Sequence, residues 1–204
     1  MKYIMTMMAL CLASPSYAHM MWFDKEAKSE LKIFYGEFDH HEKTGAVLDK
    51  LVPKVIAENR REPDISRRPD FIAVQGSGDM RASDERYPLF KEGGKVMRPK
   101  FFARWGRHTP HSAMAFEFVP VGQDSDTLVL TRDGKPVPDA DVTWVLPANL
   151  AGKTKTDSAG RISIPAGLRG RVLLEAARVD FTPGSFDGAS YDFEAMVTTI
   201  AFDR

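Results

Sequence analysis

The chain has 204 residues and a single cysteine. Its 28 lysine and arginine side chains balance 28 aspartate and glutamate side chains. A formal net charge of zero gives no electrostatic argument for nucleic acid or an anionic membrane surface as the partner. The length suits one large or two small domains, with enough chain to bury a hydrophobic core without disulfides.

Residues 1–18 have the pattern of a secretory signal peptide. A basic start at Lys2 precedes the apolar run YIMTMMALCLA, and the small residues Ser16 and Ala18 occupy the −3 and −1 positions of a cleavage site. The alternative, a buried N-terminal helix, is less favoured because Pro15 would interrupt its hydrogen bonding. We therefore expect cleavage after Ala18 and export to the periplasm.

The same segment holds Cys11, the only cysteine of the chain. A lipid anchor on it is not expected, because the large Leu10 stands where a lipidation site needs a small residue. Cleavage would leave a mature protein that begins at His19 and has neither a disulfide nor a thiolate ligand. No later stretch is long and apolar enough to span a bilayer, so we expect a soluble protein without direct membrane insertion.

Residues 19–122 are interpreted as an N-terminal β-rich domain. The apolar residues between 47 and 56 recur at near-helical spacing, but Pro53 interrupts them, so we expect extended chain with one helical turn. The polar stretch 58–70 is expected to be a loop, and VGQDSD (121–126) to be the domain boundary. Strands are expected at 31–36, 70–75, 95–105 and 113–121.

Residues 123–204 predict a second domain, a small antiparallel β-sandwich of transthyretin or immunoglobulin type. Short runs rich in Val, Ile, Leu and Thr alternate with turn signals such as Asp133-Gly134, where glycine supplies a positive φ. The expected strands cover 127–131, 141–147, 152–157, 161–165, 171–179 and 191–202, and the Gly/Pro-rich stretch before the last is expected to be a loop. The fold class is therefore all-β, with two β-sandwich-like domains.

The histidines are the candidate metal ligands, and all five precede the second domain: His19, His40, His41, His108 and His111. After cleavage, the α-amine of His19 would lose its proton at little cost near neutral pH, and the imidazole of the same residue can close a chelate ring with it. Two nitrogen donors of this kind suit Cu(II), Ni(II) and Co(II). The alternative is that His19 is an incidental product of cleavage.

Two further histidine clusters could complete such a site. GEFDHHEK (36–43) adds Asp39, His40, His41 and Glu42, and on a strand the two histidines would face opposite sides, so that only one could reach a given ion. In RHTPH (107–111), Pro110 favours a bent loop that can bring the two rings together. Each cluster has a plain alternative, a polar loop that holds two histidines by chance.

Other side chains add weaker signals. Met20, Met21, Met80, Met97 and Met114 could offer thioether sulfur to Cu(I), although methionine more often fills a hydrophobic core. The three tryptophans, Trp22, Trp105 and Trp144, could form a sugar platform, but a core role is favoured for each. The sequence contains no nucleophile elbow, no phosphate-binding glycine loop and no dinucleotide fingerprint.

Several motifs extend over nearly the whole of the chain after residue 18: the start AHMMWF, the strand LKIFYG, the pair DGKPVPDADVTWV and TDSAGRISI, and the closing YDFEAMVTTIAF. With these motifs the sequence resembles the domain of unknown function 4198 family. The resemblance implies a periplasmic accessory protein associated with nickel or cobalt uptake, whose leading histidine corresponds to His19 and whose following aromatic residue corresponds to Trp22. Many members have a histidine near EAARVD, where this chain has Arg178 and Asp180.

The first hypothesis is therefore a non-catalytic protein that binds a divalent transition-metal ion, nickel or cobalt before copper, and passes it to a membrane transporter. Asp39 or Glu42 could ligate the ion or orient a histidine ring. One alternative is a copper monooxygenase with an N-terminal histidine brace, and another is an interaction module in which the histidines play no part. Because sandwiches host all three functions, the fold alone does not decide among them.

Overall fold

The computed structural model describes residues 19–25, 30–38, 40–41, 47–59, 61–146, 150–167 and 169–204. Within these ranges nearly all regular structure is β-strand, and the helical structure is one 3-10 turn, η1 (Leu48–Lys50). The expected all-β, sandwich-like fold is confirmed, and so is the helical turn just before Pro53. In this part of the chain, no helix has the length and apolar character needed to cross a membrane.

The strands follow one another in short segments, apart from three long ones near the middle and the end of the chain. They are β1 (Met20–Lys25), β2 (Leu31–Glu37), β3 (His40–His41), β4 (Lys54–Ala57), β5 (Ile65–Arg67), β6 (Ile72–Val74), β7 (Met80–Asp84), β8 (Phe90–Glu92), β9 (Lys95–Trp105), β10 (Phe116–Pro120), β11 (Thr127–Arg132), β12 (Lys135–Pro136), β13 (Asp141–Leu146), β14 (Leu150–Lys155), β15 (Arg161–Ser163), β16 (Arg171–Asp180), β17 (Gly184–Phe186), β18 (Ala189–Tyr191) and β19 (Phe193–Asp203).

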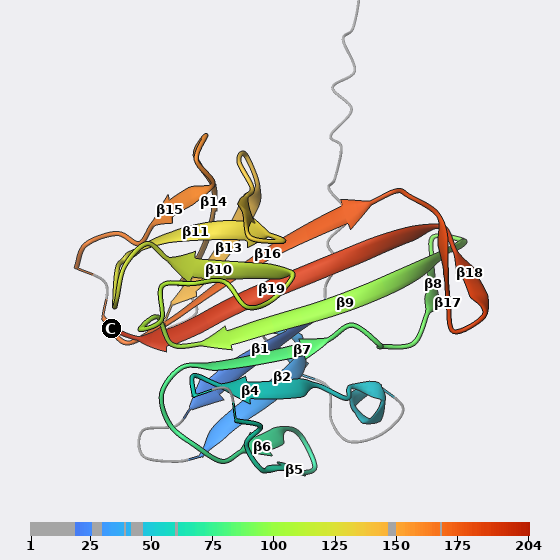
Figure 1. Ribbon diagram of the computed structural model, residues 1–204, viewed down its shortest axis with the longest axis horizontal. Coiled ribbons are helices and arrows are strands. Elements are labelled where there is room, and N and C mark those ends of the chain that lie inside the picture. Colours follow the sequence, from blue (N-terminus) through green and yellow to red (C-terminus); the bar gives the residue numbers. More distant parts are fainter. Residues whose placement is uncertain are drawn as a thin grey trace, which may run out of the picture.

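These strands form three larger sheets and one hairpin. The first sheet has the order β1-β2-β6-β5, with β3 on β2. The central sheet has the order β14-β13-β16-β19-β9-β7-β4, with β8 on β9, and the third sheet has the order β10-β11-β12, with β15 on β11. Figure 1 shows β9 and β19 side by side across the molecule, with β10 and β11 on one side of them and β1, β2 and β6 on the other.

The strands β9 and β19 are buried on both faces, and each face belongs to a different core. Phe101 on β9 and Val197 on β19 pack into a core with residues of the first sheet. Their neighbours Phe102 and Met196 point the other way, into a core with residues of the third sheet. Because side chains alternate along a strand, one pair of strands serves both cores, and two sandwiches share the central sheet.

Strands from both sides of the boundary expected at 121–126 share sheets. β10 and β11 flank that segment and pair antiparallel, while β9 pairs parallel with β19 over nine residue pairs from Phe193↔Met97 to Ala201↔Trp105. The division into parts 19–122 and 123–204 stays a prediction, and in the structure main-chain hydrogen bonds join the two parts.

Several segments differ from the sequence expectation, among them β7 and β8, where no strand was expected. The stretch 58–70, expected as a loop, contains β5, whose three residues are exposed and pair with β6 through their main chain. The Gly/Pro-rich stretch before β19 forms the hairpin β17–β18, and no strand was expected at β1. β5, β17 and β18 have no buried residue, so the hydropathy pattern carries little signal for them. β1 is different, because its residues Met21, Trp22 and Phe23 are buried and its short apolar run directly follows the expected cleavage site.

Candidate functional site

His19 lies directly before β1, at the edge of the core that the first and central sheets share. Its ring centroid is 5.5 Å from that of Tyr35 on β2, with the two planes tilted by 42°. A pocket of about 200 Å³ opens beside it, lined also by Tyr35, Val47, Lys50 and residues 87–90. A smaller opening of about 30 Å³ places His19 beside Glu92, Met97 and Phe101. At this position the imidazole lies beside aromatic side chains, and the polar side chains of Lys50 and Glu92 also line the two openings.

The pairing of β1, β2 and β3 brings two of the histidine-bearing segments to one end of the first sheet. Met20 pairs with Gly36, and Gly36 pairs in turn with His41. The next row on β2 and β3 is Glu37 with His40, and His19 lies one residue before Met20, at the end of this row. Two strand spacings separate positions 19 and 40, roughly 10 Å. The sheet register therefore assigns His40, rather than His41, to the row of His19.

The remaining candidates of this segment lie partly outside the described part of the chain. Asp39 and Glu42 are not among the described residues, and only the main chain of His40 and His41 is described. Both histidines belong to strand β3. Successive residues of a strand face opposite sides of the sheet, so the expectation that one of the two could reach a given ion applies to this segment.

The structure does not bring His108 or His111 to His19. Both follow the last residue of β9, Trp105, whereas His19 lies beside Pro99 near the start of that strand, roughly 20 Å away at the rise of an extended chain. The His108 ring lies 3.3 Å from Asp124 (Nδ1 to Oδ2). Within the described ranges, no three His, Cys, Asp or Glu side chains are grouped so that they could hold a metal ion.

The segment with His108 and His111 is held by a buried charge cluster of Asp79, Arg81, Arg104 and Glu117. Arg104 lies 2.8 Å from Asp79 and 3.0 Å from Glu117, and Arg81 lies 2.6 Å from Glu117. Each of the four side chains is at most 7% exposed. No functional role was expected for these four residues, although a charged residue inside an apolar strand, Arg104 in FFARW and Glu117 in AFEFVP, indicates a buried charge.

This cluster holds the loop after β9 through its backbone. Asp79 accepts hydrogen bonds from the amides of His108 (3.2 Å) and Thr109 (2.9 Å), and Arg104 donates to the Thr109 carbonyl (2.6 Å). Burial alone would raise the pKa of Asp79, but the amide of Thr109 and the charge of Arg104 outweigh it and hold the pKa below its ordinary value. Burial lowers the pKa of Arg104, and its acidic neighbours oppose this effect. The carbonyl of His111 accepts a hydrogen bond from Arg81 of the same cluster (2.9 Å).

Most methionines fill the cores, as the sequence favoured. Met21 and Met80 belong to the core of the first and central sheets, and Met114 packs against the core of the third sheet. Met97 lines the small opening beside His19, although its side chain is 3% exposed.

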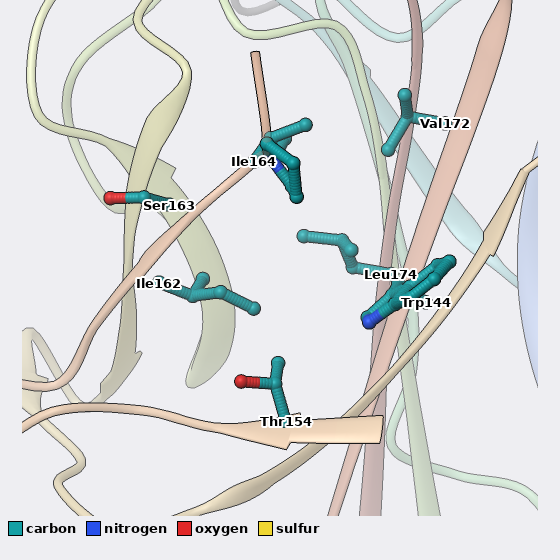
Figure 2. Close-up of a pocket in the computed structure, with 8 residues that line it drawn as sticks. Trp144, Thr154, Ile162, Ser163, Ile164, Val172 and Leu174 are labelled. Carbon is teal, nitrogen blue, oxygen red and sulfur yellow. The ribbon is translucent and has the colours of Figure 1, made fainter. Parts of the chain in front are cut away.

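The three tryptophans do not form a common platform. Trp22 stacks on Phe34 with ring centroids 5.6 Å apart, and the Arg171 guanidinium lies 4.7 Å from the ring centroid of Trp105. Trp144 lines a pocket of about 100 Å³ in the second sandwich, where Figure 2 shows it and Leu174 opposite Ile162 and Ile164. No titratable side chain lines this pocket, so it can accept a small apolar group but offers no acid or base.

A comparison with protein-family models found no match, and a comparison with curated proteins found none either. The resemblance to the domain of unknown function 4198 family stays a prediction.

Proposed function

We propose that this protein is an exported, non-catalytic accessory protein that binds one divalent transition-metal ion at the start of β1 and passes it to a membrane uptake system. The observation that carries the proposal is the strand register, in which His19 ends the row formed by Glu37 and His40. Cleavage after Ala18 would add the free α-amine at the same point.

His19 would supply two nitrogen donors, its amine and its imidazole, and His40 would supply a third across β2. Glu37, which is exposed and lies between them in the row, would ligate the ion or accept a hydrogen bond from a ligating ring. A site with three nitrogen donors fits nickel, cobalt or copper better than magnesium or calcium. The resemblance to a family associated with nickel and cobalt uptake favours the first two metals.

The surroundings of His19 fit this donor set. Its ring is partly exposed beside two openings, so an ion can reach it from solvent. Tyr35 and Phe101 line the apolar side of these openings and would limit the approach of water to one side of the ion. Such a site needs neutral imidazoles, so the affinity for the metal ion should fall as the pH is lowered.

The test is a calorimetric titration of the mature protein, verified to begin at His19, with Ni(II), Co(II), Cu(II) and Zn(II). A second preparation keeps one extra residue before His19 and so displaces the amine. We expect one-to-one binding that weakens by at least about tenfold when the amine is displaced, since a nitrogen ligand is lost.

Two neighbouring variants locate the third ligand. His40→Ala should weaken binding by at least about tenfold, while His41→Ala, one residue along the same strand, should leave it nearly unchanged. Equal binding by both N-terminal preparations would move the site away from His19. Copper-dependent consumption of an oxidant and a reductant would instead indicate a histidine-brace oxygenase, and no binding of any metal would leave an interaction module.

A further inference from the structure

A second cavity lies on the face of the central sheet that carries the buried charge cluster. It has a volume of about 360 Å³, within the range of small-molecule sites in proteins. Its floor comes from the edge strand β4 and its neighbour β7, and its wall is the segment 111–115 that leads into β10. We call it the Arg81 cavity; its lining comprises Lys54, Ile56, Ala57, Glu58, Arg81, Ser83, Glu85 and residues 111–115.

The guanidinium of Arg81 is held rigidly at the floor of this cavity. Its Nε donates to Glu117 at 2.6 Å and its Nη2 to the carbonyl of His111 at 2.9 Å. Nη1 has no hydrogen-bond partner in the described part of the chain, and the side chain is only 7% exposed. A carboxylate that enters the cavity would therefore meet a fixed donor, and no side-chain entropy would be lost in positioning it.

The wall of the cavity is held in place by the same cluster. Glu117, whose side chain has no exposed surface, accepts hydrogen bonds from the amides of Ala113 (2.8 Å) and Met114 (3.1 Å). The wall lines the space with the polar residues His111 and Ser112 as well as with Ala113, Met114 and Ala115. The cavity is thus formed before any ligand arrives, and it combines a fixed cation with a lining of both polar and apolar side chains.

The charges along the floor follow the register of β4 and β7. Lys54 pairs with Ser83, and Ile56 pairs with Arg81, so two cations lie in adjacent rows of one face, roughly 7 Å apart along the strands. Glu58 follows the end of β4 on the Arg81 side and is oriented by the Thr109 hydroxyl, which donates to its Oε1 at 2.9 Å. A positive region and a neighbouring negative group therefore share one small cavity.

We propose that the Arg81 cavity binds a small zwitterion of the amino-acid class. The carboxylate would lie on Arg81 and Lys54, the ammonium group would face Glu58, and an aliphatic side chain would pack on Ile56 and Met114. A dicarboxylate would bring its second charge toward Glu58 or Glu85, where like charges repel. A plain anion would leave the Glu58 carboxylate without a cationic partner, so the zwitterion makes more of the available charge contacts than a dicarboxylate or a plain anion.

The test is an NMR titration of the ¹⁵N-labelled protein with L-leucine, leucinamide, N-acetyl-leucine and succinate. Leucine should shift the amide signals of 81–83 and 111–115. Leucinamide lacks the carboxylate, N-acetyl-leucine lacks the ammonium group, and succinate carries a second carboxylate instead. Each of the three should bind at least about tenfold more weakly than leucine, because a charge-assisted hydrogen bond is lost.

Two exposed residues test the assignment without disturbing the buried cluster, to which Arg81 belongs. Lys54→Met should weaken the binding of leucine and N-acetyl-leucine but leave the binding of leucinamide unchanged. Glu58→Gln should weaken the binding of leucine and leucinamide but leave the binding of N-acetyl-leucine unchanged. Lys135→Met, a matched change of an exposed lysine on β12, should alter none of them. The proposal is overturned if no probe shifts the amides of 111–115, if all probes bind equally, or if succinate binds most tightly.

Discussion

Arg104 and Glu117 form an ion pair of 3.0 Å in which neither side chain exposes any surface. The pair joins β9 of the central sheet to β10 of the third sheet. Arg81 on β7 donates to the same carboxylate oxygen of Glu117 as Arg104 does. Asp79 accepts a hydrogen bond from the guanidinium of Arg104. Because a buried charge without its partner is costly, this cluster commits the two sheets to one arrangement and secures the loop between β9 and β10.

Removing one member of the cluster should therefore destabilise the protein strongly. Glu117→Ala leaves two buried guanidinium groups without their shared partner and frees the amides of Ala113 and Met114. We expect a loss of about 3–5 kcal/mol in the free energy of unfolding, as for other broken buried ion pairs. Urea denaturation followed by circular dichroism measures it.

The matched control is an exposed ion pair. Arg86 and Asp187 lie 3.2 Å apart with side chains 75% and 65% exposed, so Arg86→Ala should cost at most about 1 kcal/mol. If both variants lost the same stability, the buried cluster would not be an anchor of the fold.

Asp79 should make stability depend on acid pH. Its folded-state pKa lies below the ordinary value of about 3.8, so its contribution is complete above pH 4 and is lost as pH falls through the folded pKa. Asp79→Asn should be less stable at pH 7 by about 1–3 kcal/mol, and its stability should change less steeply below pH 4. Thermal unfolding between pH 2 and pH 7 checks both; parallel pH curves for the two proteins would contradict it.

Glu175 should behave in the opposite way. Burial raises its pKa above the ordinary value, against a hydrogen bond from Thr143 and the charge of Lys153. A raised pKa favours the folded state below the unfolded-state pKa, and this advantage is lost as pH rises through the folded pKa. Glu175→Gln should therefore be more stable than the parent at pH 7 and lose that advantage below pH 4. Urea denaturation at both pH values measures this, and an advantage of equal size at both would argue against the raised pKa.

Gly152 should be needed for the position of Trp144. The two residues are cross-strand partners on β14 and β13, and a Cβ at position 152 would overlap Cζ2 of the indole. Gly152→Ala should displace the ring, shift its fluorescence, and cost about 1–3 kcal/mol of stability by overpacking.

Gly122→Ala provides the control, because a Cβ there would meet nothing within 4 Å. Its stability and fluorescence should match those of the parent. An unchanged fluorescence spectrum in Gly152→Ala would show that the indole does not rest on residue 152.

The sequence by itself determined the all-β class and the place of most strands. β9 spans the 95–105 expected for it, and the turn at Asp133-Gly134 has positive φ at both residues, as a tight hairpin requires. These features are local: the period of apolar residues and the chemistry of turns are set within a few residues of chain. The same local signals missed β5 and the hairpin β17–β18, which have no buried residue, and β1, whose run MMWFDK is apolar over only its first four residues.

Only the tertiary structure decided which distant residues meet. The parallel pairing of β9 with β19 makes one sheet serve two cores, and it joins segments about a hundred residues apart. The register of three strands separated His19 from His108 and aligned it with Glu37 and His40. Burial brought Arg104 to Glu117 and left one nitrogen of Arg81 beside a cavity. Partners of this kind are chosen by the free energy of packing whole sheets together, which no short stretch of sequence contains.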